Sequence, residues 1–376
     1  MRHLLVTNDF PPKLGGIQSY LWELWRRLPP ESTTVLTTPH AGDRAFDAAQ
    51  PIRVERDRAR VLLPTRSLVR RIDALAAEVD ADLVLLDPAL PLGQLGPRLE
   101  RPYGVVLHGA EVTVPGRLPL TRSLLGRVLR EARIVIAAGG YPAAEAARAA
   151  GRPLPTVVVP PGVDPERFLP LDPARRSAAR ARFGLAPEQF AVLGLSRLVP
   201  RKGFDVLIAA AARLAPSHPH LRVLIAGAGR DRRRLERLAA RLGSPVDFLG
   251  RVPDPELAEL HGAVDLFAML CRDRWGGLEQ EGFGIVFLEA ASAGVAALAG
   301  RSGGSGEAVD HGRTGLVMDD PRDVDAVAVA IAELLGDEPR RLALGATARN
   351  RVLTEFTYDA LAEHLDTSLR ALGRTL

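Results

Sequence analysis

Two glutamates stand eight residues apart in Glu281-Gly-Phe-Gly-Ile-Val-Phe-Leu-Glu289, the first on a loop and the second on the helix that the loop opens. Eight residues span just over two helical turns, so both carboxylates can point toward one ligand. Carboxylates accept hydrogen bonds from vicinal hydroxyl groups, which sugars and riboses carry. The backbone N–H groups at the start of the helix suit phosphate oxygens, and they belong to Phe283, Gly284, Ile285 and Val286. The pattern predicts a site for a sugar that is linked to phosphate.

Lysine is rare in this chain, because arginine supplies all but Lys13 and Lys202 of the 49 basic residues. Both lysines stand beside glycines, in PPKLGG and PRKGFD. A compact ammonium on a flexible stem is not equivalent to a planar guanidinium. Arg197 ends an expected strand and Lys202 lies in the loop that follows, so the two can hold a pyrophosphate. No acidic residue separates them, so we expect them to repel each other unless an anion neutralises both. A solvated basic loop is the alternative.

A second glycine-containing loop follows the first expected strand and runs from Asn8 to Gln18. Its adjacent glycines, Gly15 and Gly16, allow close approach of a ligand to the backbone, and the helix that starts there favours an anion such as phosphate. A tight turn without a ligand also uses glycine. This loop alone is therefore a weak signal.

Composition narrows the class of protein. The chain has 376 residues, of which 47% are hydrophobic, enough for two or three globular domains. No apolar run is long enough to span a membrane, and Asp9 interrupts the N-terminus before a signal peptide could develop, so we expect a cytoplasmic protein. The single cysteine, Cys271, excludes an internal disulfide and a multi-cysteine metal site, and a small core residue is the simplest interpretation.

The net charge of +4 is unevenly distributed. Residues 1–165 carry all the excess, concentrated in Arg53–Arg71 and Arg117–Arg133, which indicates an anionic partner for this half. The second segment predicts an amphipathic basic helix of the kind that lies on anionic lipid, and we expect such a helix to act at the inner face of the cell membrane. An ordinary surface helix packed on the core is the alternative. The chain shows no nucleic-acid-binding signature and only 5% aromatic residues, so nucleic acid is not an expected partner.

Short apolar runs alternate with helical patterns along the whole chain, which predicts parallel-sheet α/β lobes. The expected strands of the first half are 4–7, 34–37, 83–86, 105–107, 134–137 and 157–159, and those of the second are 192–195, 223–226, 246–249, 266–269, 295–298 and 316–318. Residues 160–187 are the best linker candidate, and a final helix is expected over 358–372. We expect an active site in the cleft between two such lobes, where strand ends present their loops.

Taken together, these residues resemble the retaining glycosyltransferases of family 4, which have the GT-B fold of two facing Rossmann-like domains. The resemblance covers essentially the whole chain. It implies an acceptor-binding domain at 1–165, with a C-terminal helix over about 356–376 crossing back to it, and a nucleotide-sugar-binding domain at 166–355. It also implies that Arg197 and Lys202 bind the donor phosphates with Gly16, that Glu281 contacts the transferred sugar, and that Glu289 contacts the donor ribose. The same resemblance places Arg251 and Val252 beside the base.

His108, in LHGAE, looks like the active-site histidine of this family near the donor sugar. Without the resemblance, a core histidine that caps a strand end would be the simpler interpretation. By the same likeness Arg197, Lys202 and Glu281 are catalytic together with His108.

A closer likeness is carried by VTNDFPP, GGIQSY, FDAAQP, SRLVPRKG and LCRDRWGGLEQEGFGIVFLEA. These segments resemble the actinobacterial enzymes that use GDP-mannose to extend phosphatidylinositol mannosides, above all the group that adds an α-1,6-linked mannose. The likeness implies that Gly15 and Gln18 face an inositol-phosphate acceptor, and it gives the basic half an anionic phospholipid partner. Three segments depart from the pattern: Ala110 replaces a histidine, 295–298 lacks a proline, and Ser305-Gly306 replaces Ala-Pro. The first departure concerns the acceptor side.

The resemblance implies transfer with retention and without a metal, with the leaving phosphate taking the proton of the acceptor. Asp80-Ala-Asp82 and Asp323-Val-Asp325 mimic a metal motif but fall at expected helix ends. An NAD(P)-dependent oxidoreductase is a distant alternative, because Gly227-Ala228-Gly229 follows a strand; Arg232 replaces its third glycine. A sugar phosphorylase and a non-catalytic lipid-surface protein remain further alternatives, as does another donor or acceptor within family 4.

Overall fold

A computed structural model describes residues 1–375, and the chain forms two compact units. Unit 1 contains Met1–Pro161 and the chain from Tyr358 onward, and unit 2 contains Gly162–Thr357. The division thus follows Pro161, four residues before the position that the sequence indicates. The final helix, α15 (Tyr358–Gly373), packs on helix α1 (Gly16–Trp25) of unit 1, and Arg27 forms an ion pair with Asp359 across this contact.

Unit 1 is built on a seven-stranded parallel sheet with the order β3-β2-β1-β4-β5-β6-β7. The strands are β1 (His3–Thr7), β2 (Thr33–Thr37), β3 (Arg53–Arg56), β4 (Leu83–Asp87), β5 (Tyr103–Leu107), β6 (Val135–Ala137) and β7 (Thr156–Val158). The order of the strands reverses direction between β1 and β4, as it does in Rossmann-like folds. Parallel strands that are buried on both faces read as continuous apolar runs, which explains why the sequence located six of these seven.

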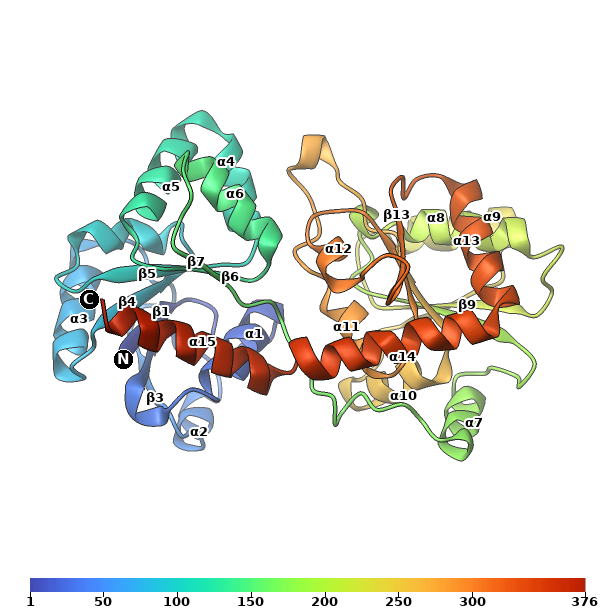
Figure 1. Ribbon diagram of the computed structural model, residues 1–376, viewed down its shortest axis with the longest axis horizontal. Helices are drawn as coiled ribbons and strands as arrows, with labels where there is room; N and C mark the ends of the chain where they lie inside the picture. The colour runs from blue at the N-terminus through green and yellow to red at the C-terminus, as the bar shows by residue number, and fades with distance from the viewer. Residues whose placement is uncertain (376) are drawn as a thin grey trace. The chain divides into compact units, whose positions relative to one another are not determined.

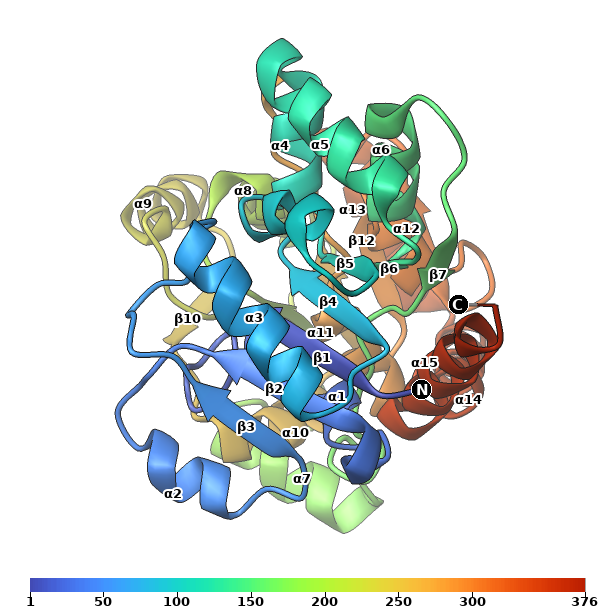
Figure 2. The same ribbon diagram turned by 90° about the vertical axis from the view of Figure 1, so that its left-hand side faces the viewer.

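Helices cover both faces of the unit 1 sheet (Figure 1). Alternate residues of a strand point to opposite faces, so Leu4 and Val6 join one core while Leu5 joins the other. The first core includes side chains of α3 (Arg66–Glu78), α4 (Ala110–Arg117), α5 (Pro119–Glu131) and α6 (Gly140–Ala150). The second includes side chains of α1 and α15. Figure 2 shows α3 lying across the sheet face that is turned toward the viewer.

Unit 2 repeats this topology with six parallel strands in the order β10-β9-β8-β11-β12-β13. The strands are β8 (Phe190–Leu195), β9 (Leu221–Ala226), β10 (Val246–Gly250), β11 (Leu266–Met269), β12 (Ala297–Gly300) and β13 (Gly315–Met318). One face is covered by α8 (Phe204–Leu214), α9 (Arg232–Leu242) and α13 (Val324–Gly336). The other is covered by α10 (Leu257–Ala263), α11 (Ile285–Ser292) and α14 (Glu338–Glu355). Two doubly wound α/β units therefore confirm the expected fold class.

Three expectations about elements are wrong, and each has a local cause. The expected strands did not include β3, because this edge strand has the polar sequence RVER and is partly exposed. It placed β12 two residues too early, because the N–H of Val295 closes the end of α11 by donating to the carbonyl of Ala290. Helix α7 (Pro173–Arg182) lies inside the proposed linker; Asp172 caps its first turn.

The basic segment Arg117–Arg133 forms the end of α4 and all of α5, with Pro119 as the first residue of the second helix. Leu125, Val128 and Leu129 of α5 are buried in the core, as the alternative of an ordinary surface helix requires. Leu120 and Leu124 are exposed. Within residues 1–375, no helix combines the length and the apolar character that crossing a membrane demands.

Candidate functional site

Arg197, Lys202 and Glu281, three of the predicted donor residues of unit 2, lie where its strand order reverses, between β8 and β11. The loop after β8 carries Arg197 and Lys202, and the loop after β11 carries Glu281. Ligands of open parallel sheets bind at the carboxyl ends of the strands at such a reversal. The topology therefore brings the predicted residues to the place where a doubly wound sheet offers a ligand site.

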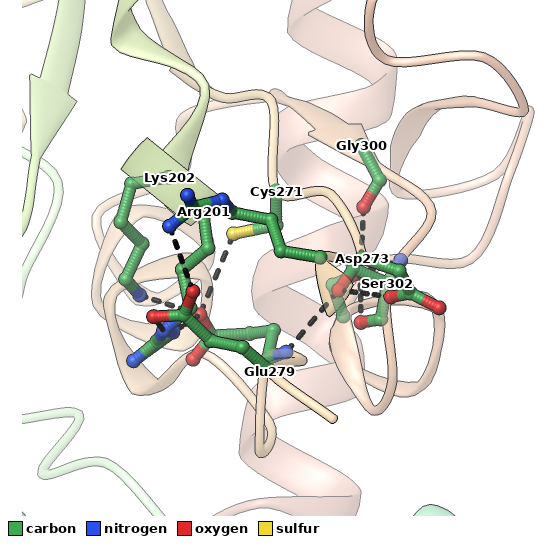
Figure 3. Close-up of polar contacts among 10 residues, drawn as sticks. Arg201, Lys202, Cys271, Asp273, Glu279, Gly300 and Ser302 are labelled. Atoms are coloured by element: carbon green, nitrogen blue, oxygen red, sulfur yellow. Dashed lines mark hydrogen bonds and ion pairs between the residues drawn. The ribbon is translucent and has the colours of Figure 1, made fainter. Parts of the chain in front are cut away.

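An ion cluster joins these two loops (Figure 3). Lys202 Nζ lies 2.6 Å from Glu281 Oε2, and Arg201 Nη1 lies 2.9 Å from the same oxygen. Glu281 is only 7% exposed and Lys202 only 5% exposed. Ion pairs that are withdrawn from water interact more strongly than surface pairs. One carboxylate oxygen thus links the lysine loop to the glutamate loop.

The cluster keeps Glu281 ionised. Burial raises the pKa of this carboxyl, but the cations of Lys202 and Arg201 outweigh burial and hold the pKa below its ordinary value of 4.5. Cys271 lies nearby, with Sγ 3.5 Å from Glu281 Oε2, and burial together with the Glu281 charge raises the pKa of its thiol. A buried neutral thiol is a packing residue, which confirms the simplest interpretation of the lone cysteine.

The backbone of the loop that carries Glu281 is held by hydrogen bonds that involve a serine and an aspartate. The N–H of Glu281 donates to Ser302 Oγ at 3.2 Å, and that hydroxyl donates to Asp273 Oδ1 at 2.7 Å (Figure 3). Ser305, one of the departures from the family pattern, donates its hydroxyl to the carbonyl of Gly300 at 2.6 Å. These contacts fix the position of Glu281 before any ligand arrives.

The glycine after Lys202 permits close packing. Gly203 has a φ of +70°, and a Cβ there would lie 2.0 Å from the carbonyl oxygen of Leu270. Only glycine fits this approach of the β8 loop to the end of β11. The packing places Lys202 beside the loop that carries Glu281.

The expected repulsion between Arg197 and Lys202 is only partly correct. Glu281, 79 residues away in the chain, supplies the missing negative charge for Lys202. Sequence spacing cannot show such a pair, because the two residues meet only when β8 and β11 become neighbours. Arg197 itself is exposed, and its side chain makes no hydrogen bond or ion pair within residues 1–375. Its guanidinium is available for an anion.

Glu289 lies in α11 and has a different partner from Glu281. Its Oε2 is 3.3 Å from Nε2 of His261, a residue of α10 that is completely buried. Phe283 and Gly284 are buried at the start of α11, while Ile285 and Val286 are half-buried. Arg251 is exposed after β10, and Val252 is half-buried beside it. The sequence did not single out His261, which contacts Glu289 only through packing of α10 on α11.

In unit 1 the two glycines that lead into α1 differ, because a Cβ on Gly15 would lie 2.2 Å from Oε1 of Gln18 whereas Gly16 has open space. Gly15 and Gly16 are exposed, and a Cβ on Gly16 would have no atom within 4 Å. Gln18 is buried, and its Nε2 donates to Asp9 Oδ1 at 2.6 Å. Lys13 Nζ lies 3.0 Å from the same oxygen. Asp9 therefore positions the side chains of Gln18 and Lys13.

His108 follows β5 and is not an isolated core residue. Its Nε2 lies 2.7 Å from Asp87 Oδ1, at the end of β4. Glu111 caps the start of α4 by accepting from the backbone N–H groups of His108 and Gly109. Ala110, where the family pattern has a histidine, is exposed on the first turn of α4. The sequence also did not indicate four further residues of the two sites, because only the fold brings them to the predicted residues. They are Arg201, Asp273, Thr7 and Asp87.

The glycines that suggested a dinucleotide fingerprint have a packing role. Gly227 has a φ of +122°, and a Cβ there would lie 1.9 Å from the carbonyl oxygen of Ser196. Asp323 caps α13 by accepting from the N–H groups of Asp325 and Ala326, so this acidic pair serves a helix end. Among residues 1–375, no three His, Cys, Asp or Glu side chains are grouped to hold a metal ion.

Comparison with known proteins assigns the chain to a family. Glycosyltransferase Family 4 matches residues 14–167, and Glycosyl transferases group 1 matches residues 175–351. The chain is 42% identical, over 98% of both proteins, to the GDP-mannose-dependent alpha-(1-6)-phosphatidylinositol monomannoside mannosyltransferase of Mycobacterium tuberculosis. It is 36% identical, over 99% of this chain and 98% of the relative, to the monoacylated phosphatidylinositol monomannoside mannosyltransferase of Corynebacterium glutamicum.

A solved structure shows the same fold. The Anabaena protein HepE in complex with UDP superposes with a TM-score of 0.81 over 99% of this chain and 100% of HepE, at 24% sequence identity. This likeness extends through both units.

Proposed function

The chain belongs to family 4 of the glycosyltransferases and, within it, to the GDP-mannose-dependent mannosyltransferases, and we propose that it transfers mannose from GDP-mannose to a phosphatidylinositol mannoside. The observation that carries this proposal is the buried cluster of Lys202, Arg201 and Glu281 at the carboxyl ends of β8 and β11. Relatives that share 36–42% of their residues with almost the whole chain carry this activity in their names.

Unit 2 supplies the donor site in this proposal. Arg197 and Lys202 bind the diphosphate, with further donors from the N–H groups at the start of α11. The positive charge of both residues stabilises the negative charge that develops on the departing GDP. Glu281 binds hydroxyl groups of the mannose, and Glu289 binds the ribose.

Unit 1 supplies the acceptor site. Gly15 and Gln18 contact the inositol phosphate, and His108 contacts the donor mannose. The bond from mannose C1 to the phosphate oxygen breaks, and C1 bonds to the acceptor hydroxyl on the same face. The hydroxyl proton passes to the leaving phosphate, so no covalent enzyme intermediate is needed. Arg197 and Lys202 supply the positive charge that a metal ion provides in metal-dependent transferases. The proposal therefore includes metal-independent transfer.

Thermal stabilisation tests the choice of donor. GDP and GDP-mannose are expected to raise the midpoint of thermal unfolding in the presence of EDTA, because a ligand that binds only the folded protein stabilises it. UDP-glucose, ADP-glucose and NADPH are expected to leave the midpoint unchanged. A shift of the midpoint with UDP- or ADP-sugars alone would contradict GDP-mannose as the donor. A shift that requires added Mg²⁺ would contradict the metal-independent mechanism.

We also propose that α5 docks unit 1 on the cytoplasmic face of an anionic membrane, as a peripheral protein. Leu120, which is 89% exposed, and Leu124 stand one turn apart on α5. Arg122, Arg127 and Arg130 are exposed on the same helix. Exposed leucines beside arginines suit the boundary between anionic headgroups and acyl chains. Such docking would deliver the lipid acceptor to unit 1.

The double substitution Leu120→Asp and Leu124→Asp is expected to lower binding to vesicles that contain phosphatidylinositol by about tenfold or more. The reason is that two apolar contacts with the membrane are replaced by carboxylates, which the negatively charged headgroups repel. Co-sedimentation with the vesicles measures the binding. Val329→Asp, at an exposed apolar residue of α13 in unit 2, serves as the matched control and should sediment as the unsubstituted protein does. Unchanged sedimentation of the double variant would show that α5 is not the docking surface.

A further inference from the structure

A buried carboxylate lies at the point of unit 1 where the strand order reverses. Thr7 is the last residue of β1 and Asp87 is the last residue of β4, and the two are direct partners in the register of these strands. His108 follows β5, the next strand along the sheet. The reversal therefore places three side chains with hydrogen-bonding groups on neighbouring strand ends.

Both oxygens of Asp87 have a defined partner. Oδ1 lies 2.7 Å from Nε2 of His108, and Oδ2 accepts from the hydroxyl of Thr7 at 2.6 Å. Asp87 is only 1% exposed and Thr7 is fully buried. A buried carboxylate with two close partners has little freedom to rotate. Its position consequently fixes the His108 ring.

The ring of His108 is also held from its sides. The ring of Tyr20, from α1, lies edge-on at 5.3 Å between centroids, and the hydroxyl of Tyr20 is occupied by the carbonyl of Val159. With Nε2 directed to Asp87, Nδ1 is the ring nitrogen that makes no hydrogen bond within residues 1–375. Nδ1 is thus the nitrogen that can meet a ligand.

The charges around His108 favour its protonated form. Burial is the largest single influence and lowers the pKa of His108, but the charge and hydrogen bond of Asp87, together with the charges of Glu111 of α4 and Asp9 of the β1 loop, outweigh it. The pKa of His108 therefore lies above its ordinary value of 6.5. Tyr20 is the other titratable group that faces the ring, and burial raises the pKa of its phenol, so it stays neutral.

Thr7 also connects His108 to the loop that carries Gln18. The single proton of the Thr7 hydroxyl goes to Asp87, and its oxygen accepts from the N–H of Asp9 at 2.9 Å. The side chain of Asp9 in turn accepts from Gln18. Hydrogen bonds to the backbone and to the side chain of Asp9 thus link the expected acceptor residue Gln18, through Thr7 and Asp87, to the expected sugar-facing residue His108.

We propose that Asp87 and Thr7 are positioning residues, which hold His108 with Nδ1 toward the donor sugar and tie it to the acceptor loop. This inference rests on the proposed function for the role of His108, although the geometry of the pair does not depend on that function. Neither positioning residue contacts a substrate in this proposal. Their effect passes through the orientation and protonation of the imidazole.

Asp87→Asn tests the charge, and the pH dependence of mannosyl transfer is the measurement. Without the carboxylate, burial lowers the pKa of His108, so the limb of the kcat profile that reports this residue is expected to move to lower pH by about one unit or more. We expect kcat at neutral pH to fall roughly 10- to 100-fold, with little change in KM for GDP-mannose. Asp359→Asn, at an exposed aspartate of α15, is the matched control and should leave the profile unchanged.

Two threonine variants test the connection. Thr7→Val removes the hydroxyl and is expected to lower kcat about tenfold, while Thr7→Ser keeps the hydroxyl and should restore most of the activity. A fall in activity with an unmoved pH limb in Asp87→Asn, or equal loss in the serine and valine variants, would show that the pair only supports the fold.

Nitrogen-15 NMR of the histidines separates this inference from the proposed function. The His108 signal, assigned through His108→Gln, is expected to show a protonated Nε2 in the unsubstituted protein and a lower pKa in Asp87→Asn. This result would support the pair even if mannose were not transferred. A neutral ring with its proton on Nδ1 would overturn the pair, whatever the activity.

Discussion

Replacing Glu281 with glutamine is expected to lower mannosyl transfer at least about a hundredfold. The amide keeps the size of the side chain but removes the charge that Lys202 and Arg201 share at 2.6 and 2.9 Å. Lys202 then lacks its counter-charge, Arg201 keeps only its looser contact with Glu279, and the sugar loses a charged hydrogen-bond acceptor. Transfer of labelled mannose from GDP-mannose to phosphatidylinositol mannoside in vesicles measures the effect.

Glu279→Gln is the matched control for this substitution. Glu279 lies two residues earlier and pairs with Arg274 at 3.0 Å, while its contact with Arg201 is looser at 3.8 Å. We expect Glu279→Gln to cost less than tenfold in transfer. Circular dichroism should show that both variants fold. Preserved transfer in Glu281→Gln would remove this residue from the sugar site.

The difference in stability between the unsubstituted protein and Glu281→Gln should depend on pH. The pKa of Glu281 is lower in the folded than in the unfolded protein, so its ion pairs stabilise the fold above pH about 4.5. This stabilisation is lost as the pH falls through the folded-state pKa. The gap in unfolding temperature between the unsubstituted protein and Glu281→Gln should therefore be widest near neutral pH and should narrow in acid.

Replacing Lys202 with methionine is expected to lower kcat by about 10²- to 10³-fold and to raise KM for GDP-mannose. Lys202 is the buried cation of the cluster, and the proposal assigns it to the charge that develops on the leaving diphosphate. Arg201 remains bonded to Glu281 in this variant, so the carboxylate keeps one cation and the protein is expected to fold. Steady-state kinetics of mannosyl transfer separates the two parameters.

Lys202→Arg is expected to be nearly as inactive as the methionine variant. The lysine is 5% exposed and packs where Gly203 meets Leu270, so a larger planar guanidinium has little room. Arg213→Met, at an exposed arginine of α8 that pairs with Asp325, controls for loss of positive charge. A Lys202→Met protein with more than about a tenth of the original activity would exclude the proposed role of this residue.

The sequence by itself was sufficient for the fold class and the family. Buried parallel strands are continuous apolar runs, so nearly all strands of both sheets could be recognised locally. The elements that it missed or misplaced, β3, α7 and the start of β12, are those whose residues are polar or serve a neighbouring turn. The segments around Lys202, Glu281 and Gln18 carried the family likeness, and relatives over almost the whole chain confirm it.

Only the tertiary structure decided how the functional residues are partnered. Lys202 pairs with Glu281 across 79 residues, and Thr7 pairs with Asp87 across 80. Such pairs arise where β8 meets β11 and where β1 meets β4, at the two reversals of strand order. A local pattern can identify a charged residue, but its ionisation and orientation depend on burial and on charges brought from distant parts of the chain. The chemistry of each site is therefore set by which strands become neighbours.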